Sequence, residues 1–325
     1  MKRAVGGPEG FLILDKPAGC TSHDVVGSVR RALRERRVGH GGTLDPDATG
    51  VLVVAVGQAT RLLRFVSDLD KTYTAEVVLG TATTTLDSGG AVTATADMSG
   101  VTIEDVTSAA ATLTGAIEQV PPMVSAIRVG GRRLYEIARE GETVERAPRS
   151  VTVKRFSVAP GSEPGTIAIE VDCSSGTYIR SLADDLGTAL GGYAHLRNLV
   201  RTRIGAFTLD EAWRIDDVDP TMLRPPIELV GHLEGVEVDG DIAAMVAHGR
   251  VLEREVLGVD GAGPWVVRSG GQLLAIYEAH RSGTGKPLLV YRGPEGAPGG
   301  DTVDPSSVEV GHGRPDNFEA MSTEA

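Results

Sequence analysis

Apolar and polar residues in the first sixty positions follow a pattern that predicts two strands with a helix between them. One short apolar run covers 10–15, and a second, over 51–56, is typical of a buried strand. Between them, apolar residues spaced three and four apart predict a helix over about 23–37. Thr21 and Asp24 stand where a capping box would begin that helix.

The pattern continues toward the C-terminus with shorter elements. Further strands are predicted over 73–79, 151–158 and 167–173, and helices over 103–114 and 178–190. Short strands with glycine-rich turns, as in a small β-barrel, are predicted over 265–268, 272–278 and 288–292. The expected organisation is a flexible arm at 1–10, a large domain at 11–225 with a Pro-, Gly- and Arg-rich excursion at about 120–150, a C-terminal domain at 240–292, and a disordered acidic tail at 293–325.

The net charge of −12 argues at first against a polyanionic partner. Two acidic segments, 216–241 and 293–325, together carry −13, so the rest of the chain is close to neutral. Arginines cluster in that remainder, in the segments 30–37, 128–133 and 197–203. Phosphate binding depends on local charge, because the Debye length is about 8 Å at physiological salt. The charge distribution therefore permits a nucleic-acid partner.

Several classes of chemistry lack their usual signatures. The seven histidines have no paired ligand spacing, and Cys20 and Cys173, expected as buried thiols, form no CxxC motif. No phosphate loop, dinucleotide fingerprint or hydrolase nucleophile elbow is present. We therefore expect no metal and no cofactor, and a carboxylate or hydroxyl as the reactive group. No signal peptide or long apolar span is evident, so we expect a cytoplasmic protein without membrane contact.

Three positions are candidates for that chemistry. Asp45 lies in the glycine-rich loop 39–50, where Pro46 biases it toward an extended backbone; locally, a plain turn residue would look the same. Arg180 falls in the first turn of the helix predicted at 178–190, an unfavourable place for a cation, which indicates an anionic partner, either a carboxylate or a phosphate; a surface arginine that reaches solvent is the alternative. Tyr73, at the start of a strand, could stack on a base.

Taken together, these motifs resemble the bacterial tRNA pseudouridine-55 synthase family, TruB. The resemblance covers about residues 10–215 and rests on Gly10-Phe11 to Lys16-Pro17, Thr21-Ser22, Gly39 to Gly50, Gly57 to Thr60, Lys71 to Tyr73, Pro121 to Met123 with Ser125-Ala126, Leu134-Tyr135 to Ala138-Arg139, Cys173 to Arg180, and Ala194 to Thr202. It implies an α+β pseudouridine-synthase fold, with a mixed, mostly antiparallel sheet flanked by helices. A small PUA-like β-barrel, suggested by His248-Gly249-Arg250, would follow at 240–292.

The resemblance also implies roles for single residues. Asp45 matches the nucleophile, Arg180 the arginine that pairs with it, and Tyr73 the tyrosine that stacks on the target base and is a candidate to remove its proton. The substrate-binding residues would be His40, Leu199, Lys16, Arg30, Arg34 and Arg132. Two departures from the family pattern stand out: Gly41 replaces the usual Thr, and the motif near Thr83 to Asp87 lacks its first Asp.

The implied function is isomerisation of uridine-55 in the T loop of tRNA, by base flipping and exchange of a C–N for a C–C glycosidic bond. We expect Arg180 to hold the pKa of Asp45 low. Attack at C6, attack at C1′ and removal of a ribose proton all remain open as routes for Asp45. The expected partner is the T-arm stem-loop, bound by a monomer without an obligate protein partner.

Three alternatives are weighed against this function. A tRNA-folding chaperone of the same fold would not need Asp45, Tyr73 and Arg180 together. A glycosidase using Asp45 and Asp47 would need two carboxyls at a defined separation, which neighbouring loop residues rarely provide. A guide-dependent synthase would need partner proteins, and the compact length and acidic tail favour the stand-alone type.

Overall fold

The computed structural model describes residues 7–292 except 126–127, 130, 134–136, 138–139, 141 and 143. Several sequence motifs therefore lie outside the described residues, including Ala126, Leu134-Tyr135 and Ala138-Arg139. The predicted acidic tail at 293–325 and most of the predicted N-terminal arm also lie outside them.

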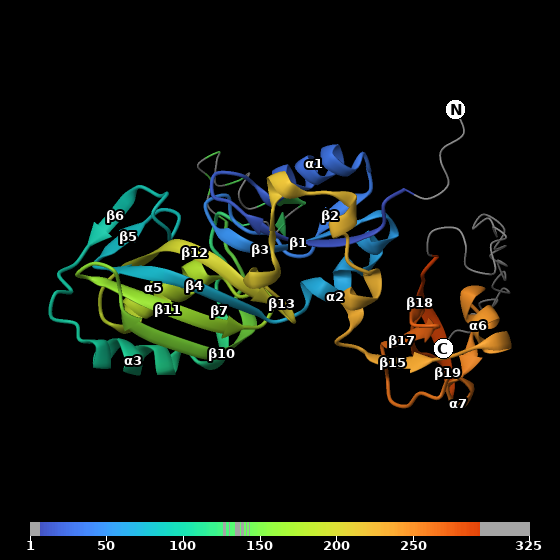
Figure 1. Cartoon of the computed structure of the whole chain (residues 1–325). Helices are drawn as coiled ribbons and strands as arrows, with labels where there is room; N and C mark the ends of the chain where they lie inside the picture. The colour runs from blue at the N-terminus through green and yellow to red at the C-terminus, as the bar shows by residue number, and fades with distance from the viewer. Residues whose placement is uncertain are drawn as a thin grey trace, which may run out of the picture.

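A ten-stranded mixed sheet forms the main body, and it confirms the predicted sheet type (Figure 1). Its order is β14-β1-β3-β12-β4-β11-β10-β7, with β2 on β3 and β13 on β12. Only the β1–β14 and β3–β12 pairs are parallel. The strands are β1 Gly10–Lys16, β2 Val38–His40, β3 Thr49–Val56, β4 Lys71–Leu79, β7 Gly115–Gln119, β10 Arg149–Pro160, β11 Thr166–Cys173, β12 Ala194–Ile204, β13 Phe207–Thr208 and β14 Trp213–Arg214. Two small hairpins, β5 Thr81–Thr83 with β6 Val92–Thr95 and β8 Arg128–Val129 with β9 Arg132–Arg133, project from it.

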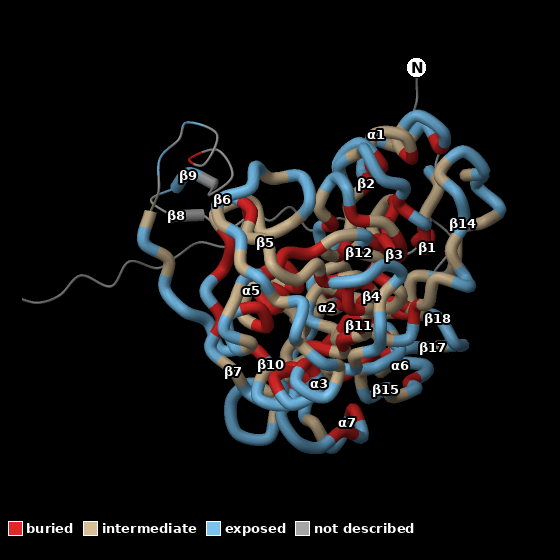
Figure 2. Tube along the Cα trace, turned by 90° about the vertical axis from the view of Figure 1, so that its left-hand side faces the viewer, coloured by how far each residue is buried: buried red, intermediate tan, exposed pale blue. Residues whose placement is uncertain are grey.

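The two halves of this sheet are covered differently. Around β1 and β3 both faces are buried, which is why these strands read as unbroken apolar runs (Figure 2). Helix α1 (Ser22–Leu33) packs on one of these faces, and η1 (Gly57–Leu62), α2 (Leu63–Ser67) and η5 (Pro226–Val230) lie at the other. Around β4 and β11, helices α3 (Ile103–Thr112) and α5 (Ile179–Ala189) cover one face. The opposite face carries cross-strand ion pairs such as Arg197 Nε with Glu76 Oε2, 3.0 Å apart.

A five-stranded sheet follows, in the order β15-β17-β18-β19-β16, where the sequence predicts a small β unit. Its elements are β15 Glu234–Glu237, α6 Gly240–Ala247, β16 Leu252–Glu253, α7 Arg254–Leu257, β17 Trp265–Ser269, β18 Gln272–Ala279 and β19 Thr284–Val290. Apolar residues of β18 and β19 share one core cluster with Phe11 and Val53 of the main sheet. The two sheets therefore pack on each other, and the division into domains near 216–241 stays a prediction.

Helix α1 begins as predicted and ends earlier. Its capping box of Thr21 and Asp24 is formed, but the helix stops at Leu33 and Arg34 takes a left-handed conformation with φ 52°. The prediction that the helix runs to Arg37 is therefore wrong. The chain turns at Arg34 because residues 38–40 pair with β3 as strand β2. Arg37 consequently does not extend the helical face that carries Arg30.

Candidate active site

The loop that carries Asp45 connects β2 to β3 and is anchored to the sequence around α1. Ser22 bonds both backbone groups of Leu44, accepting from its N–H at 2.9 Å and donating to its carbonyl at 3.2 Å. The Pro46 carbonyl accepts from the Lys16 ammonium at 2.9 Å and from the Gly19 N–H at 3.0 Å. Both neighbours of Asp45 are thus held in place, while 41% of its own side chain is exposed.

A buried arginine on β12 also hydrogen-bonds to the loop that carries Asp45. The guanidinium of Arg201, on β12, donates to the carbonyls of Gly42 at 3.0 Å, Thr43 at 3.3 Å and Val51 at 2.8 Å. Gly50 permits this approach, because a Cβ there would lie 2.3 Å from the Arg201 carbonyl oxygen and φ is +100°. With 1% of its surface exposed, Arg201 is a fixed cation beneath the loop.

Arg180 meets Asp45 from the first turn of α5. Its Nη2 lies 2.9 Å from Asp45 Oδ2, and its Nη1 lies 3.6 Å from Asp87 Oδ2. The carbonyls of Thr85 and Val124 accept further hydrogen bonds at 2.9 and 2.8 Å. The expected anionic partner is therefore a carboxylate. Since only 4% of the Arg180 side chain is exposed, its charge is directed at this pair of aspartates.

The N-terminus of helix α5 is hydrogen-bonded to a side chain of strand β7. Tyr178 occupies the N-cap position without capping the helix through its own side chain. Instead, the buried amide of Gln119, at the end of β7, accepts from the Tyr178 N–H at 2.7 Å and donates to its carbonyl at 3.0 Å. Ser181 donates to the neighbouring Val120 carbonyl at 3.0 Å. These bonds fix the turn from which Arg180 projects.

The pKa of Asp45 differs from the expectation that Arg180 would hold it low. Burial raises the pKa of Asp45 above 3.8, the charge of Arg180 opposes the rise, and the nearby Asp87 adds to it. The guanidinium offsets the cost of desolvation only in part. Without Arg180, the Asp45 carboxylate would be harder still to ionise.

Tyr73 and Leu199 lie near this pair, in the core of the same half of the sheet. Tyr73 is 8% exposed and belongs to the apolar cluster that contains Leu44, and Leu199 packs against that cluster. Burial raises the pKa of Tyr73, although the Arg201 cation opposes the rise. The phenol therefore stays protonated at neutral pH, which disfavours Tyr73 as a phenolate base.

The predicted substrate-binding residues lie in different surroundings. Lys16 is fully buried and donates to the carbonyls of Pro17, Cys20 and Pro46, which argues against direct contact with phosphate. Arg132 pairs with Glu140 and, at 3.7 Å, with Glu142 on the excursion. Arg34 is exposed at the end of α1.

His40 and Arg30 both line a pocket that is separate from the Asp45–Arg180 pair. In the sequence, His40 precedes Asp45 by five residues. Burial lowers the pKa of His40, and electrostatic interactions with Arg201 and His23 lower it further.

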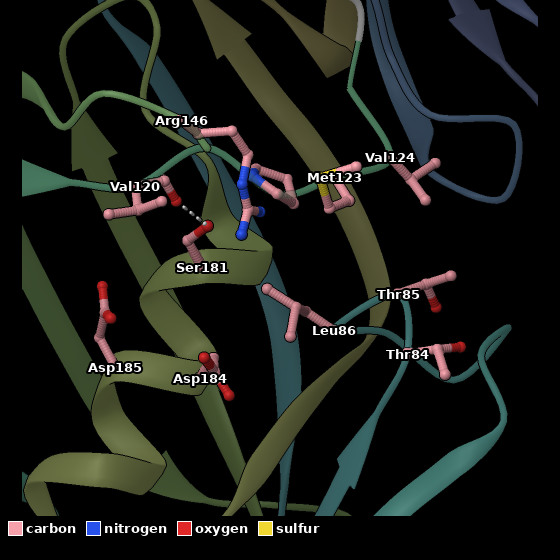
Figure 3. A pocket seen from close by; sticks show the side chains of 11 residues that line it. Thr84, Thr85, Leu86, Val120, Met123, Val124, Arg146, Ser181, Asp184 and Asp185 are labelled. Atoms are coloured by element: carbon pink, nitrogen blue, oxygen red, sulfur yellow. Dashed lines mark hydrogen bonds between the residues drawn. The ribbon is translucent and has the colours of Figure 1, made fainter. Parts of the chain in front are cut away.

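A cavity of about 260 Å³ adjoins Arg180, between α5 and the two segments whose carbonyls bind the guanidinium (Figure 3). Thr84 to Leu86 form one side and Val120 to Val124 another, with Arg146 above Ser181. Asp184 and Asp185 project from α5 into it. Burial, together with the charge of Asp184, raises the pKa of Asp185 to about 6.

Sequence reasoning missed three residues that shape the site: Asp87, Gln119 and Arg201. Asp87 lay in the motif noted as incomplete, and its pairing with Arg180 was not predicted. Arg201 was grouped with phosphate-binding arginines, although its partners are backbone carbonyls. Among the described residues, no three His, Cys, Asp or Glu side chains come together as metal ligands would. No helix in that part of the chain is long and apolar enough to cross a membrane.

Comparison with solved structures defines the class to which this fold belongs. A chain in the crystal structure of a Cbf5-Nop10-Gar1 complex superposes with a TM-score of 0.68 and 26% identity, over 90% of each chain. A structure of an H/ACA RNP bound to a substrate RNA containing 2′-deoxyuridine has the same fold, with a TM-score of 0.66 at 24% identity, over 90% of this chain and 91% of that one. The mixed sheet with its C-terminal β unit is the α+β fold of pseudouridine synthases.

The family is more specific than the fold. Residues 30–179 match the N-terminal domain of the TruB family of pseudouridylate synthases, and 180–225 match a C-terminal domain of tRNA pseudouridylate synthase B. The tRNA pseudouridine synthase B of Rhodococcus jostii is 47% identical over 84% of this chain and 91% of its own length. That of Symbiobacterium thermophilum is 50% identical over 74% and 82%. The chain belongs to the TruB family.

Proposed function

We propose that this enzyme converts uridine-55 in the T loop of tRNA to pseudouridine, with Asp45 as the nucleophile. The observation that carries the proposal is the 2.9 Å contact between Asp45 Oδ2 and the buried Arg180 guanidinium. Relatives up to about half identical over most of their length bear the name tRNA pseudouridine synthase B, which supports tRNA as the substrate.

The reaction breaks the N1–C1′ bond, turns the base, and forms a C5–C1′ bond; C5 then loses its proton to water and N1 takes one up, so that the product has the composition of the substrate. Because the base is buried in a folded loop, the enzyme must first flip it out, at a cost of a few kcal/mol. Stacking on Tyr73 offsets part of that cost, at about 1–3 kcal/mol per base. The Asp45 oxygen supplies the negative charge for the bond exchange, and Arg180 keeps that oxygen ionised as water is displaced.

Tyr73 enters this scheme as a stacking surface and a hydrogen-bond donor. Its buried phenol has a raised pKa, so the proposal assigns no phenolate chemistry to it. Lys16 and Arg201 are assigned to holding the loop of Asp45, because their donors are spent on backbone carbonyls. The proposed RNA contacts are His40, Leu199, Arg30, Arg34 and Arg132, with the T-arm bound by a single copy of the chain.

The proposal is tested by mapping pseudouridine in unmodified tRNA after incubation with the purified protein alone. We expect one new pseudouridine, at position 55 in the T loop, and none in a parallel reaction with Asp45→Asn. A tRNA that is bound and refolded without gaining pseudouridine would instead establish the chaperone alternative. Modification only after addition of a guide RNA and partner proteins would contradict the stand-alone mode.

A further inference from the structure

A second polar pocket lies between α1, β2 and η1. Its volume is about 510 Å³, within the roughly 300–1,000 Å³ of small-molecule sites. Polar or charged side chains around it are His23, Arg30, Arg36, Arg37, His40 and Thr60; we refer to it as the arginine pocket. In Figure 1, α1 and β2 lie against each other at this place.

The early end of α1 creates this arrangement. On a helix continued to Arg37, the arginines would have followed its surface into solvent. Because Arg34 turns the chain, Arg36 and Arg37 instead line the same pocket as Arg30. The Arg30 side chain is fixed there by a hydrogen bond from its Nη2 to the Val38 carbonyl, at 3.0 Å.

The pocket is cationic without an internal counterion. No carboxylate lines it, and Arg30, Arg36 and Arg37 form no ion pair with any described residue. Glu35, which precedes Arg36 in the sequence, accepts from the backbone N–H of Arg37 at 2.8 Å and is not part of the lining. Three guanidinium groups in one open recess repel one another, and an anion relieves that repulsion.

Two polar atoms that belong to lining residues point to the same conclusion. Arg30 Nε and His40 Nδ1 are buried and have no hydrogen-bond partner in the described structure. Buried polar groups are normally paired, so an unsatisfied pair at one site indicates a missing polar group. Arginine forks match the oxygens of a phosphate better than those of any other common biological anion except a carboxylate.

We propose that the arginine pocket binds a phosphodiester group of the same RNA strand whose uridine reaches Asp45. This inference rests on the proposed function. His40 and Asp45 are five residues apart, so the two sites are separated by at most about 18 Å of chain. A few nucleotides of a bound strand cover that distance. The pocket would hold the strand near the target while the base itself enters the site of Asp45.

The test measures binding of a fluorescent T-arm stem-loop RNA as a function of salt, with every variant in the Asp45→Asn background to prevent turnover. Each phosphate contact contributes about 0.7–0.9 to the slope of log K against log salt. We expect R36Q/R37Q to reduce that slope by about 0.7–0.9 and to weaken binding about tenfold. Both residues are exposed, so folding should be little affected.

The matched control is R31Q/R64Q, which removes the same charge from two exposed residues outside the pocket lining. It should leave the slope unchanged. Equal losses for the two double variants would mean diffuse attraction by surface charge and would overturn the proposal. An unchanged slope for R36Q/R37Q would overturn it as well.

Two further arms separate the sources of the phosphate. A blunt RNA duplex of equal length should show no difference between R36Q/R37Q and its parent, because the proposal places the contact beside the target loop. Inorganic phosphate and uridine monophosphate should compete only weakly, at millimolar concentration; tight binding of either would make this a site for a free anion. Wild-type pseudouridine formation decides the proposed function independently of all these slopes.

Discussion

Replacing Gln119 with Met tests whether the turn that carries Arg180 must be held in place. Methionine has a similar shape but cannot make the two hydrogen bonds to Tyr178, at 2.7 and 3.0 Å. The partly buried Tyr178 N–H would be left without this partner, at a cost of about 1–3 kcal/mol. The Tyr178 carbonyl would still accept from the Leu182 N–H, at 3.0 Å. Losing the bond from Gln119 to this carbonyl therefore costs less, about 1 kcal/mol.

The expected result is a loss of about 2–4 kcal/mol in the free energy of unfolding, measured by urea denaturation. The turnover number should fall by about 100-fold, because a displacement near 1 Å of a charged group at the site has that effect. Glu118, the exposed residue before Gln119, offers a control. Glu118→Gln should change neither the free energy of unfolding nor the turnover number.

Gln119→Glu separates a positioning role from a purely structural one. Ionised, the new carboxylate would face the Tyr178 carbonyl with an oxygen; protonated, it would donate to that carbonyl as the amide does. Burial raises the pKa of a carboxyl group, so protonation restores the native bond as pH falls. Activity relative to wild type should therefore recover between about pH 8 and pH 6. Full turnover by Gln119→Met at reduced stability would refute this reasoning.

Three further variants follow from the charges around the site. Arg180→Gln removes the group that opposes the rise in the pKa of Asp45, so the acidic limb of the kcat/KM profile should move to higher pH; an unmoved limb would exclude Asp45 as the titrating group. Asp185→Asn should stabilise the protein above pH 6, since a pKa raised from 3.8 to about 6 disfavours the ionised folded state; with the side chain partly exposed, solvent screening limits the gain to about 1 kcal/mol. In urea unfolding, that gain should vanish below about pH 4. Equal free energies of unfolding for Asp185→Asn and wild type at about pH 8 would contradict the prediction. Lys16→Met removes the donor to three carbonyls and should lower the free energy of unfolding by about 2–4 kcal/mol. An unchanged urea midpoint together with weaker RNA binding would instead indicate that Lys16 contacts the RNA phosphates.

Periodicity in the sequence was sufficient for elements whose cause is local. The capping box of Thr21 and Asp24, the apolar strand β3, and helices α3 and α5 depend on residues within a few positions of one another. The end of α1 was mispredicted because it depends on the pairing of β2 with β3. The spacing of apolar residues within 23–37 does not indicate that β2 pairs with β3.

The candidate site was predicted where charge gave a physical reason. A cation at the start of a helix requires compensation, and Arg180 indeed meets the Asp45 carboxylate. Lys16 was assigned to substrate binding through the resemblance, and Arg201 was part of an arginine cluster; both are buried and bind backbone carbonyls, which the sequence does not show. Gln119 gave no signal, because its partner Tyr178 lies 59 positions away.

Single-turnover kinetics with Asp45→Asn test whether the Asp45 carboxylate performs the bond exchange. Tritium release from T-arm RNA carrying 5-³H-uridine should slow by at least about 1,000-fold, while the Kd for that RNA stays within about threefold of wild type. Release at a rate near that of wild type, from RNA bound equally well, would show that Asp45 is not the nucleophile.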